Sequence, residues 1–296
     1  MKNVLIASAL AFAATSAVAA PVTSDDFTVS GEFAVGGYVD SNAEDQSRDF
    51  YNGGVTGADI GIAFEHGMFV GYGEVDVNVE DNFTAKNVGD TVDLDKLWVG
   101  VKLGKAGVLS YGVENDTALD KIDGAGDMTV EFGYSAADAD DAFNVIKFEG
   151  QHHVLAYGAS VSDTGPDADR VGTFNTYVGL VGDSSAVYAG YEIREHDTTV
   201  YTITGNTKLG FVDLGANVFT QELEGKGFDE GYFVSAGVPI SALYVSTGYA
   251  YTTDQESVAN LGASYAFNQH FEVMVDSKYN FETEDAAGFV KGAYSF

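Results

Sequence analysis

The feature that most constrains this chain is a two-residue period in polarity. Phe27, Val29 and Phe33 share one parity, whereas Thr28 and Glu32 share the other. Because successive side chains of a β-strand point to opposite faces, this alternation predicts strands with one apolar face and one polar face. Soluble β-sandwiches alternate in the same way, so the period alone leaves both kinds of protein open.

Sixteen alternating segments can be placed along the chain. We expect strands near residues 26–40, 54–65, 69–80, 93–103, 107–115, 142–150, 153–162, 172–181, 186–195, 198–207, 210–222, 230–238, 242–252, 256–266, 270–281 and 286–296. Short connections such as His66–Met68 tend to alternate with longer acidic ones such as Ser41–Gly53 and Asp116–Asp141. An even number of strands with this rhythm is typical of bacterial outer-membrane barrels. The connection His196–Asp197 breaks the rhythm between the ninth and tenth strands.

The N-terminus has the pattern of a secretory signal peptide. Lys2 precedes the apolar stretch Val4–Ala14, and Ala17–Ala19 is a small-residue cleavage site. We therefore expect a signal peptide over 1–19 and one exported domain over 20–296. After residue 19 no run of 18 apolar residues occurs, so a membrane-spanning chain of this kind has to be a closed barrel, because lipid offers no partner for unpaired backbone groups.

The composition is strongly acidic and suits sheet. The chain has 45 acidic and 14 basic side chains, a formal net charge of −31. Nucleic acid is excluded as a partner, since phosphates require Lys and Arg. An acidic surface adapted to salt is an alternative cause of the charge. The three prolines and the absence of cysteine favour extensive sheet that is stabilised without disulfides.

Four motifs carry a family resemblance. They are Gly71–Glu74, Lys96–Lys102, Ser110–Gly112 and the Asp-Met-Thr-Val-Glu-Phe-Gly stretch at 127–133. They resemble the third, fourth and fifth strands and the third loop of the general (enteric-type) trimeric porins of Gram-negative bacteria. The likeness covers about residues 54–150 and the final strand, where Tyr294 and Phe296 resemble the family's aromatic barrel-assembly signal.

This resemblance implies both a fold and a set of partners. The fold would be all-β: a 16-stranded antiparallel transmembrane β-barrel in the outer membrane, with an inward-folded third loop. The implied function is passive diffusion of ions and small hydrophilic solutes through a homotrimer. Outer-membrane lipids, lipopolysaccharide and the barrel-insertion machinery would be its partners. A loop that stays outside the barrel is the alternative for Asp116–Asp141.

The resemblance also implies a pore constriction. Asp127 and Glu131 match the family's constriction carboxylates, and Asp123 lies in the same acidic loop. Where the family has a wall arginine, this chain has Asp59, and alternation turns it inward because Ile60 takes the lipid parity.

The wall opposite the loop keeps few basic residues. Lys102 matches a wall lysine of the family, and Lys147 falls close to an arginine position if one residue is inserted. With so few basic groups facing the acidic loop, we expect a preference for cations.

Three other functions compete with this interpretation. They are a substrate-specific channel for oligosaccharides or a nutrient ion, a barrel enzyme, and a secreted acidic β-sandwich. The histidines fall mainly at predicted turns, and the adjacent pair His152 and His153 lacks convergent ligands for a metal. We therefore expect no catalytic residues, no cofactor and no metal.

Overall fold

The computed structural model describes most of the chain after the expected signal peptide. The described residues are 22–23, 26–41, 50–78, 92–134, 141–163, 172–194, 198–223, 227–253 and 256–296. The expected signal peptide, residues 1–19, lies outside them. So do the long connection at 79–91 and the acidic residues Asp138 and Asp140.

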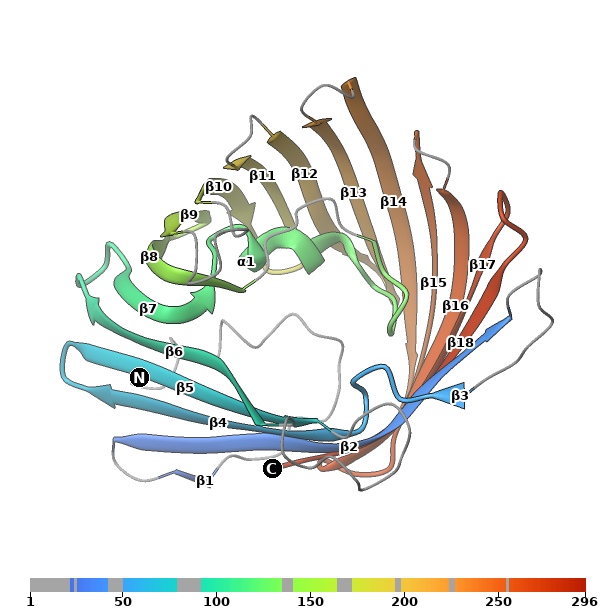
Figure 1. The fold of residues 1–296 in the computed structure, drawn as a ribbon, viewed down its shortest axis with the longest axis horizontal. Helices are drawn as coiled ribbons and strands as arrows, with labels where there is room; N and C mark the ends of the chain where they lie inside the picture. The colour runs from blue at the N-terminus through green and yellow to red at the C-terminus, as the bar shows by residue number, and fades with distance from the viewer. Residues whose placement is uncertain are drawn as a thin grey trace.

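Sixteen long strands form one antiparallel sheet (Figure 1). They are β2 (Phe27–Ser41), β4 (Gly57–His66), β5 (Phe69–Asn78), β6 (Val92–Lys102), β7 (Val108–Asp116), β8 (Asp141–His152), β9 (Leu155–Asp163), β10 (Thr173–Val181), β11 (Ser185–Arg194), β12 (Thr198–Leu209), β13 (Val212–Leu223), β14 (Gly227–Ile240), β15 (Leu243–Thr252), β16 (Glu256–Ala266), β17 (Phe271–Asn280) and β18 (Ala286–Ser295). Each strand pairs with its neighbours in the chain, and β18 pairs with β2, so the sheet closes into a barrel. Two short strands, β1 (Val22–Thr23) and β3 (Phe50–Tyr51), pair with β2.

The alternation in the sequence becomes two different faces of this barrel. Large apolar side chains such as Val99, Ile203 and Leu261 are 64%, 59% and 61% exposed on the outside. Polar side chains such as Asn175 and Asn217 take the opposite parity and are buried inside. An apolar exterior around a polar interior is the arrangement that lipid requires of a spanning barrel.

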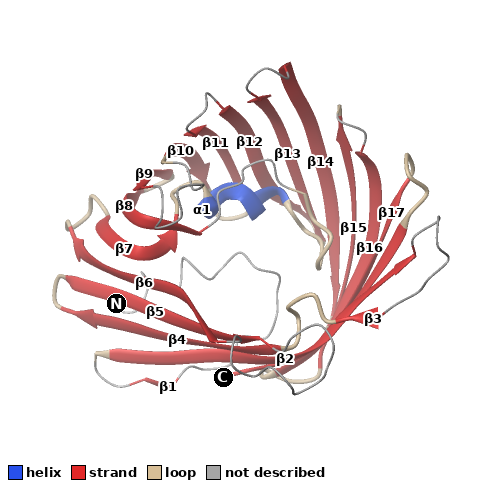
Figure 2. Cartoon of the chain, viewed as in Figure 1, coloured by secondary structure: helices blue, strands red, loops and turns tan. Residues whose placement is uncertain are grey.

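The helical structure of the described residues is short and lies between β7 and β8. The helix α1 spans Asp120–Asp123 and is followed by a single 3₁₀ turn, η2, at Gly124–Gly126. No helix in the described ranges is both long enough and apolar enough to span a bilayer. Figure 2 shows α1 inside the ring of strands.

The predicted fold class and strands are confirmed, including β11 and β12 on either side of residues 196–197. The strand predicted over 54–65 starts later, at Gly57, because the chain turns away from the sheet before it. The strand predicted over 230–238 is longer and spans Gly227–Ile240. Neither β1 nor β3 was predicted, since two residues are too few to show a period.

Candidate functional site

The connection between β7 and β8 is described over residues 117–134, and this part folds into the barrel; we call it the constriction loop. Ala118, Leu119 and Ile122 are fully buried against the inner wall. The backbone N–H of Ala118 donates to Ser160 Oγ at 2.8 Å and to Asn175 Oδ1 at 3.1 Å. In Figure 1 the described part of this loop runs inside the strands from β10 towards β14. The structure therefore places the loop within the lumen, as expected.

The middle of the constriction loop follows the wall at very close range. Asn206 Nδ2 donates to the carbonyl of Ala125 at 2.8 Å, and Ser235 Oγ donates to the carbonyl of Gly126 at 2.9 Å. A Cβ atom on Gly126 would lie 2.2 Å from the carbonyl oxygen of Ala216, which no real side chain tolerates. Glycine at this position lets the two backbones touch.

The tip of the constriction loop, Asp127–Tyr134, is attached to β16 and β17. Asp276 Oδ2 accepts the backbone N–H groups of Glu131 at 2.9 Å and Phe132 at 3.2 Å. Asn260 Nδ2 donates to the carbonyl of Phe132 at 2.8 Å. Lys278 Nζ lies 4.8 Å from the centre of the Phe132 ring, a cation–π contact.

The three predicted loop carboxylates have different surroundings. Asp127 Oδ1 accepts from the N–H and the hydroxyl of Thr129 at 2.7 and 2.6 Å, so this carboxylate bonds within its own loop. Burial raises the pKa of Asp127, although the bonds from Thr129 act in the opposite direction. Asp123 accepts from the N–H of Gly124 and caps η2. Glu131 is exposed and accepts a hydrogen bond from the Tyr38 hydroxyl.

Asp120 adds a carboxyl group that the sequence did not single out. It starts α1 and lies close to Asp116 and Asp123. Burial, followed by the charges of these two aspartates, raises the pKa of Asp120 to about 7, while Lys147 and Lys96 oppose the shift. Its charge therefore changes near neutral pH.

A row of carboxylates crosses the wall that faces the constriction loop. Asp59 points inward as expected, with Ile60 38% exposed on the outside. In the strand register Asp59 lies directly opposite Glu32 on β2 and opposite Asp76 on β5. We call Glu32, Asp59 and Asp76 the acidic row. Alternation along each strand could have identified Glu32 and Asp76 as inward-facing, but only the register between the strands places all three carboxylates side by side.

A neighbouring cluster strengthens the negative charge of this wall. Ligand oxygens of Glu74, Asp76 and Asp95 all lie within 4.8 Å of one another. Among the described residues, this trio has the reach to share one metal ion. Lys96 also lies beside it, 3.5 Å from Asp95 and 2.9 Å from Asp116.

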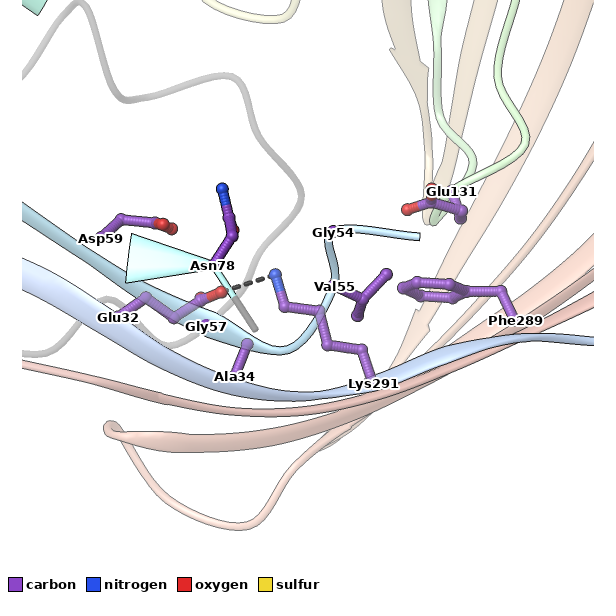
Figure 3. Close-up of a pocket in the computed structure, with 10 residues that line it drawn as sticks. All are labelled: Glu32, Ala34, Gly54, Val55, Gly57, Asp59, Asn78, Glu131, Phe289 and Lys291. Atoms are coloured by element: carbon purple, nitrogen blue, oxygen red, sulfur yellow. Dashed lines mark ion pairs between the residues drawn. The ribbon is translucent and has the colours of Figure 1, made fainter. Parts of the chain in front are cut away.

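Three lysines on β6, β8 and β18 are paired with carboxylates. Lys102 contacts Glu65, and Lys147 Nζ lies 3.7 Å from Glu149. Lys291, which the sequence did not single out, contacts Glu32 of the acidic row. Figure 3 shows this pair beside a cavity of about 100 Å³ that Asp59 also lines. The pairing balances the lysine charges locally, so they do not form a separate basic face.

Comparisons with known proteins agree with this geometry. The model of the Gram-negative porin family matches residues 7–287. OmpF of Salmonella typhi, solved in complex with daunomycin, has 14% sequence identity and a TM-score of 0.77, covering 94% of this chain and 100% of that one. A mutant of Rh. blastica porin has 13% identity and a TM-score of 0.72, covering 91% and 100% of the two chains.

Outer-membrane OmpT of Vibrio cholerae, in its trimer form, has 15% identity and a TM-score of 0.69, with 92% of this chain and 100% of that chain covered. No curated protein matches the sequence. The structural likenesses support the fold, and the family match extends over nearly the whole chain. The chain therefore belongs to the Gram-negative porins, the channel-forming barrels of the outer membrane.

Proposed function

We propose that this porin is a passive channel that prefers cations to anions. The observation that carries the proposal is the acidic row, Glu32, Asp59 and Asp76, on the wall opposite the constriction loop. A sixteen-stranded barrel encloses an aqueous lumen, and fixed charges at its narrowest part determine which ions enter. Carboxylates on adjacent strands lower the local potential and concentrate cations.

The positive charges nearby support the same sign of selectivity. Lys102 and Lys291 each contact one carboxylate and form ion pairs with no net charge, whereas Lys96 contacts two carboxylates, Asp95 and Asp116. The acidic row has three carboxylates and one paired lysine, which leaves an excess of negative charge. Glu131 adds a further exposed carboxylate on the loop side.

Reversal potentials across a planar bilayer under a KCl gradient test this proposal. We expect the reversal potential of the wild-type protein to have the sign that indicates cation preference. The preference should be smaller at high salt, because counter-ions screen the acidic row. The triple variant Glu32→Gln, Asp59→Asn, Asp76→Asn should lose much of that preference. Asp183→Asn, in the exposed turn after β10, is the matched control and should change nothing. A chloride preference in the wild type, or an unchanged potential in the triple variant, would refute the proposal.

We also propose that the protein acts without catalysis, as a homotrimer inserted by the barrel-insertion machinery among outer-membrane lipids and lipopolysaccharide. The trimer form of the OmpT structure supports the assembly. The resemblance of Tyr294 and Phe296 to the family's aromatic assembly signal supports the insertion role, and Phe296 exchanges backbone hydrogen bonds with Gly31 at 3.0 and 3.2 Å. Tyr294 is 46% exposed on the outer face beside it. Cross-linking in membranes, with a trimer as the expected product, tests the assembly.

A further inference from the structure

Between β2 and β4 the chain leaves the barrel wall. The short strand β3 pairs with β2 at Phe50 and Tyr51, and β4 joins β2 only from Gly57 onward. The residues in between, Asn52–Thr56, form no ladder with β2; we call them the lumen turn. A strand was expected here from residue 54, so this departure is a feature of the three-dimensional structure that alternation does not reveal.

The lumen turn covers the inner face of β2. Gly36 and Tyr38 share the inward parity of Glu32. A Cβ atom on Gly36 would lie 2.8 Å from Cγ1 of Val55, and one on Gly53 would lie 2.6 Å from Cδ2 of Tyr38. Both contacts put the turn on the lumen side of the wall.

Hydrogen bonds hold the lumen turn in one conformation. Asn52 is fully buried, and its Oδ1 accepts the N–H of Thr56 at 2.6 Å while its carbonyl accepts the N–H of Val55 at 3.1 Å. The Thr56 hydroxyl donates to the carbonyl of Gly36 and accepts its N–H, both at 3.0 Å. Thr56 thus supplies the hydrogen bonds that a neighbouring strand would have made.

Tyr38 connects the lumen turn to the tip of the constriction loop. Its ring lies 5.5 Å from that of Tyr51 and 6.2 Å from that of Phe132, and its hydroxyl donates to Glu131. The cavity of about 100 Å³ between the two elements is lined by Gly54 and Glu131 (Figure 3). The turn and the tip therefore face each other across a common space.

We propose that the lumen turn is a second constriction element, which limits solute size together with the tip. Gly54 is the residue at the edge of the passage. It is exposed, and a Cβ atom added there would meet no atom of the described residues within 4 Å. A side chain at this position projects into the passage, where it takes space from permeating solutes. This steric role is separate from the ion preference proposed above.

Because the chain contains no cysteine, one introduced thiol tests the proposal. Gly54→Cys is refolded and labelled with a bulky, uncharged methanethiosulfonate reagent, and the label is confirmed by mass. Gly210→Cys, in the turn between β12 and β13, is the matched control. Gly54 and Gly210 have φ values of +81° and +67°, and at neither would a Cβ meet a described atom within 4 Å, so the backbone strain is comparable.

Labelled Gly54→Cys should lose single-channel conductance in discrete steps and should admit large sugars more slowly into vesicles. Labelled Gly210→Cys should behave as its unlabelled form. Val55→Cys, which lines the same cavity, carries the test if Gly54→Cys does not fold. If a channel labelled at Gly54→Cys or Val55→Cys keeps the conductance of its unlabelled form, the proposal is wrong. It is also wrong if the water-soluble reagent labels neither cysteine in the folded protein.

Discussion

Asp276 holds the tip of the constriction loop, and Asp276→Ala should release it. The carboxylate is 4% exposed and accepts two backbone N–H groups of the tip, from Glu131 and Phe132. A hydrogen bond to a charged group contributes about 1.5–3 kcal/mol. Two such bonds that are not fully additive stabilise the docked tip by about 3 kcal/mol, which corresponds to a roughly 100-fold shift in the docking equilibrium.

Hydrogen–deuterium exchange of the peptide that contains Glu131 and Phe132 measures this directly. In Asp276→Ala we expect exchange about 100-fold faster than in the wild type, because local opening sets the rate. Asp276→Asn should be intermediate, since the amide keeps one acceptor oxygen but loses the charge. Glu272→Gln removes a buried carboxylate from the same strand and is the control. Exchange in Asp276→Ala within a few-fold of the control would refute the reasoning.

Three further predictions concern the loop and its wall. Gly190→Leu should lower the single-channel conductance, because a Cβ there would lie 2.6 Å from Cδ1 of Leu119 and push α1 into the lumen. Gly182→Leu is the control, since the atom nearest to a Cβ at that position is 3.6 Å away. Equal conductances of the two variants would contradict this prediction. The raised pKa of Asp120, from 3.8 to about 7, means that docking of α1 is most stable below pH 3.8 and weakens as pH rises through about 7. Exchange protection of α1, corrected for intrinsic rates, should therefore be lower at about pH 8 than at about pH 5, and Asp120→Asn should abolish the difference; equal protection in the wild type would argue against it. Lys102→Gln should increase cation preference by leaving Glu65 unpaired, and a shift of the reversal potential towards chloride would disprove that.

Alternation in the sequence predicted the features that each strand determines by itself, such as which side chains face inward. Alternation sufficed to turn Asp59 inward and Ile60 outward, because the lipid face of each strand has to be apolar. The same rule could not find the acidic row, since the alignment of Glu32, Asp59 and Asp76 depends on the register between three strands.

Features that depend on contacts between segments far apart in the chain could not be predicted from the sequence. The bond between Asp276 and Glu131 joins residues 145 positions apart, and no local pattern marks it. The motif indicated Asp127 and Glu131 equally. Their surroundings differ because Gly133 lets the Asp127 carboxylate pack against the loop backbone, where a Cβ atom would lie 1.5 Å from Oδ2.

The lumen turn shows a different limit of the alternation rule. We predicted a strand from residue 54, although Val55 is apolar and lies on the inward parity of Asp59. The side chains of Asn52 and Thr56 instead bond to nearby backbone groups, which competes with the ladder and bends the chain inward.

Swelling of lipid vesicles that contain the purified protein, in uncharged sugars of increasing size, tests the passive water-filled pore most directly. We expect entry rates that fall smoothly with solute size and rise in proportion to concentration, because the lumen sorts solutes by fit and charge alone. Vesicles that stay impermeable to every sugar would contradict the account. Rapid, saturable entry of one sugar among others of equal size would contradict it too, and would identify a substrate-specific channel.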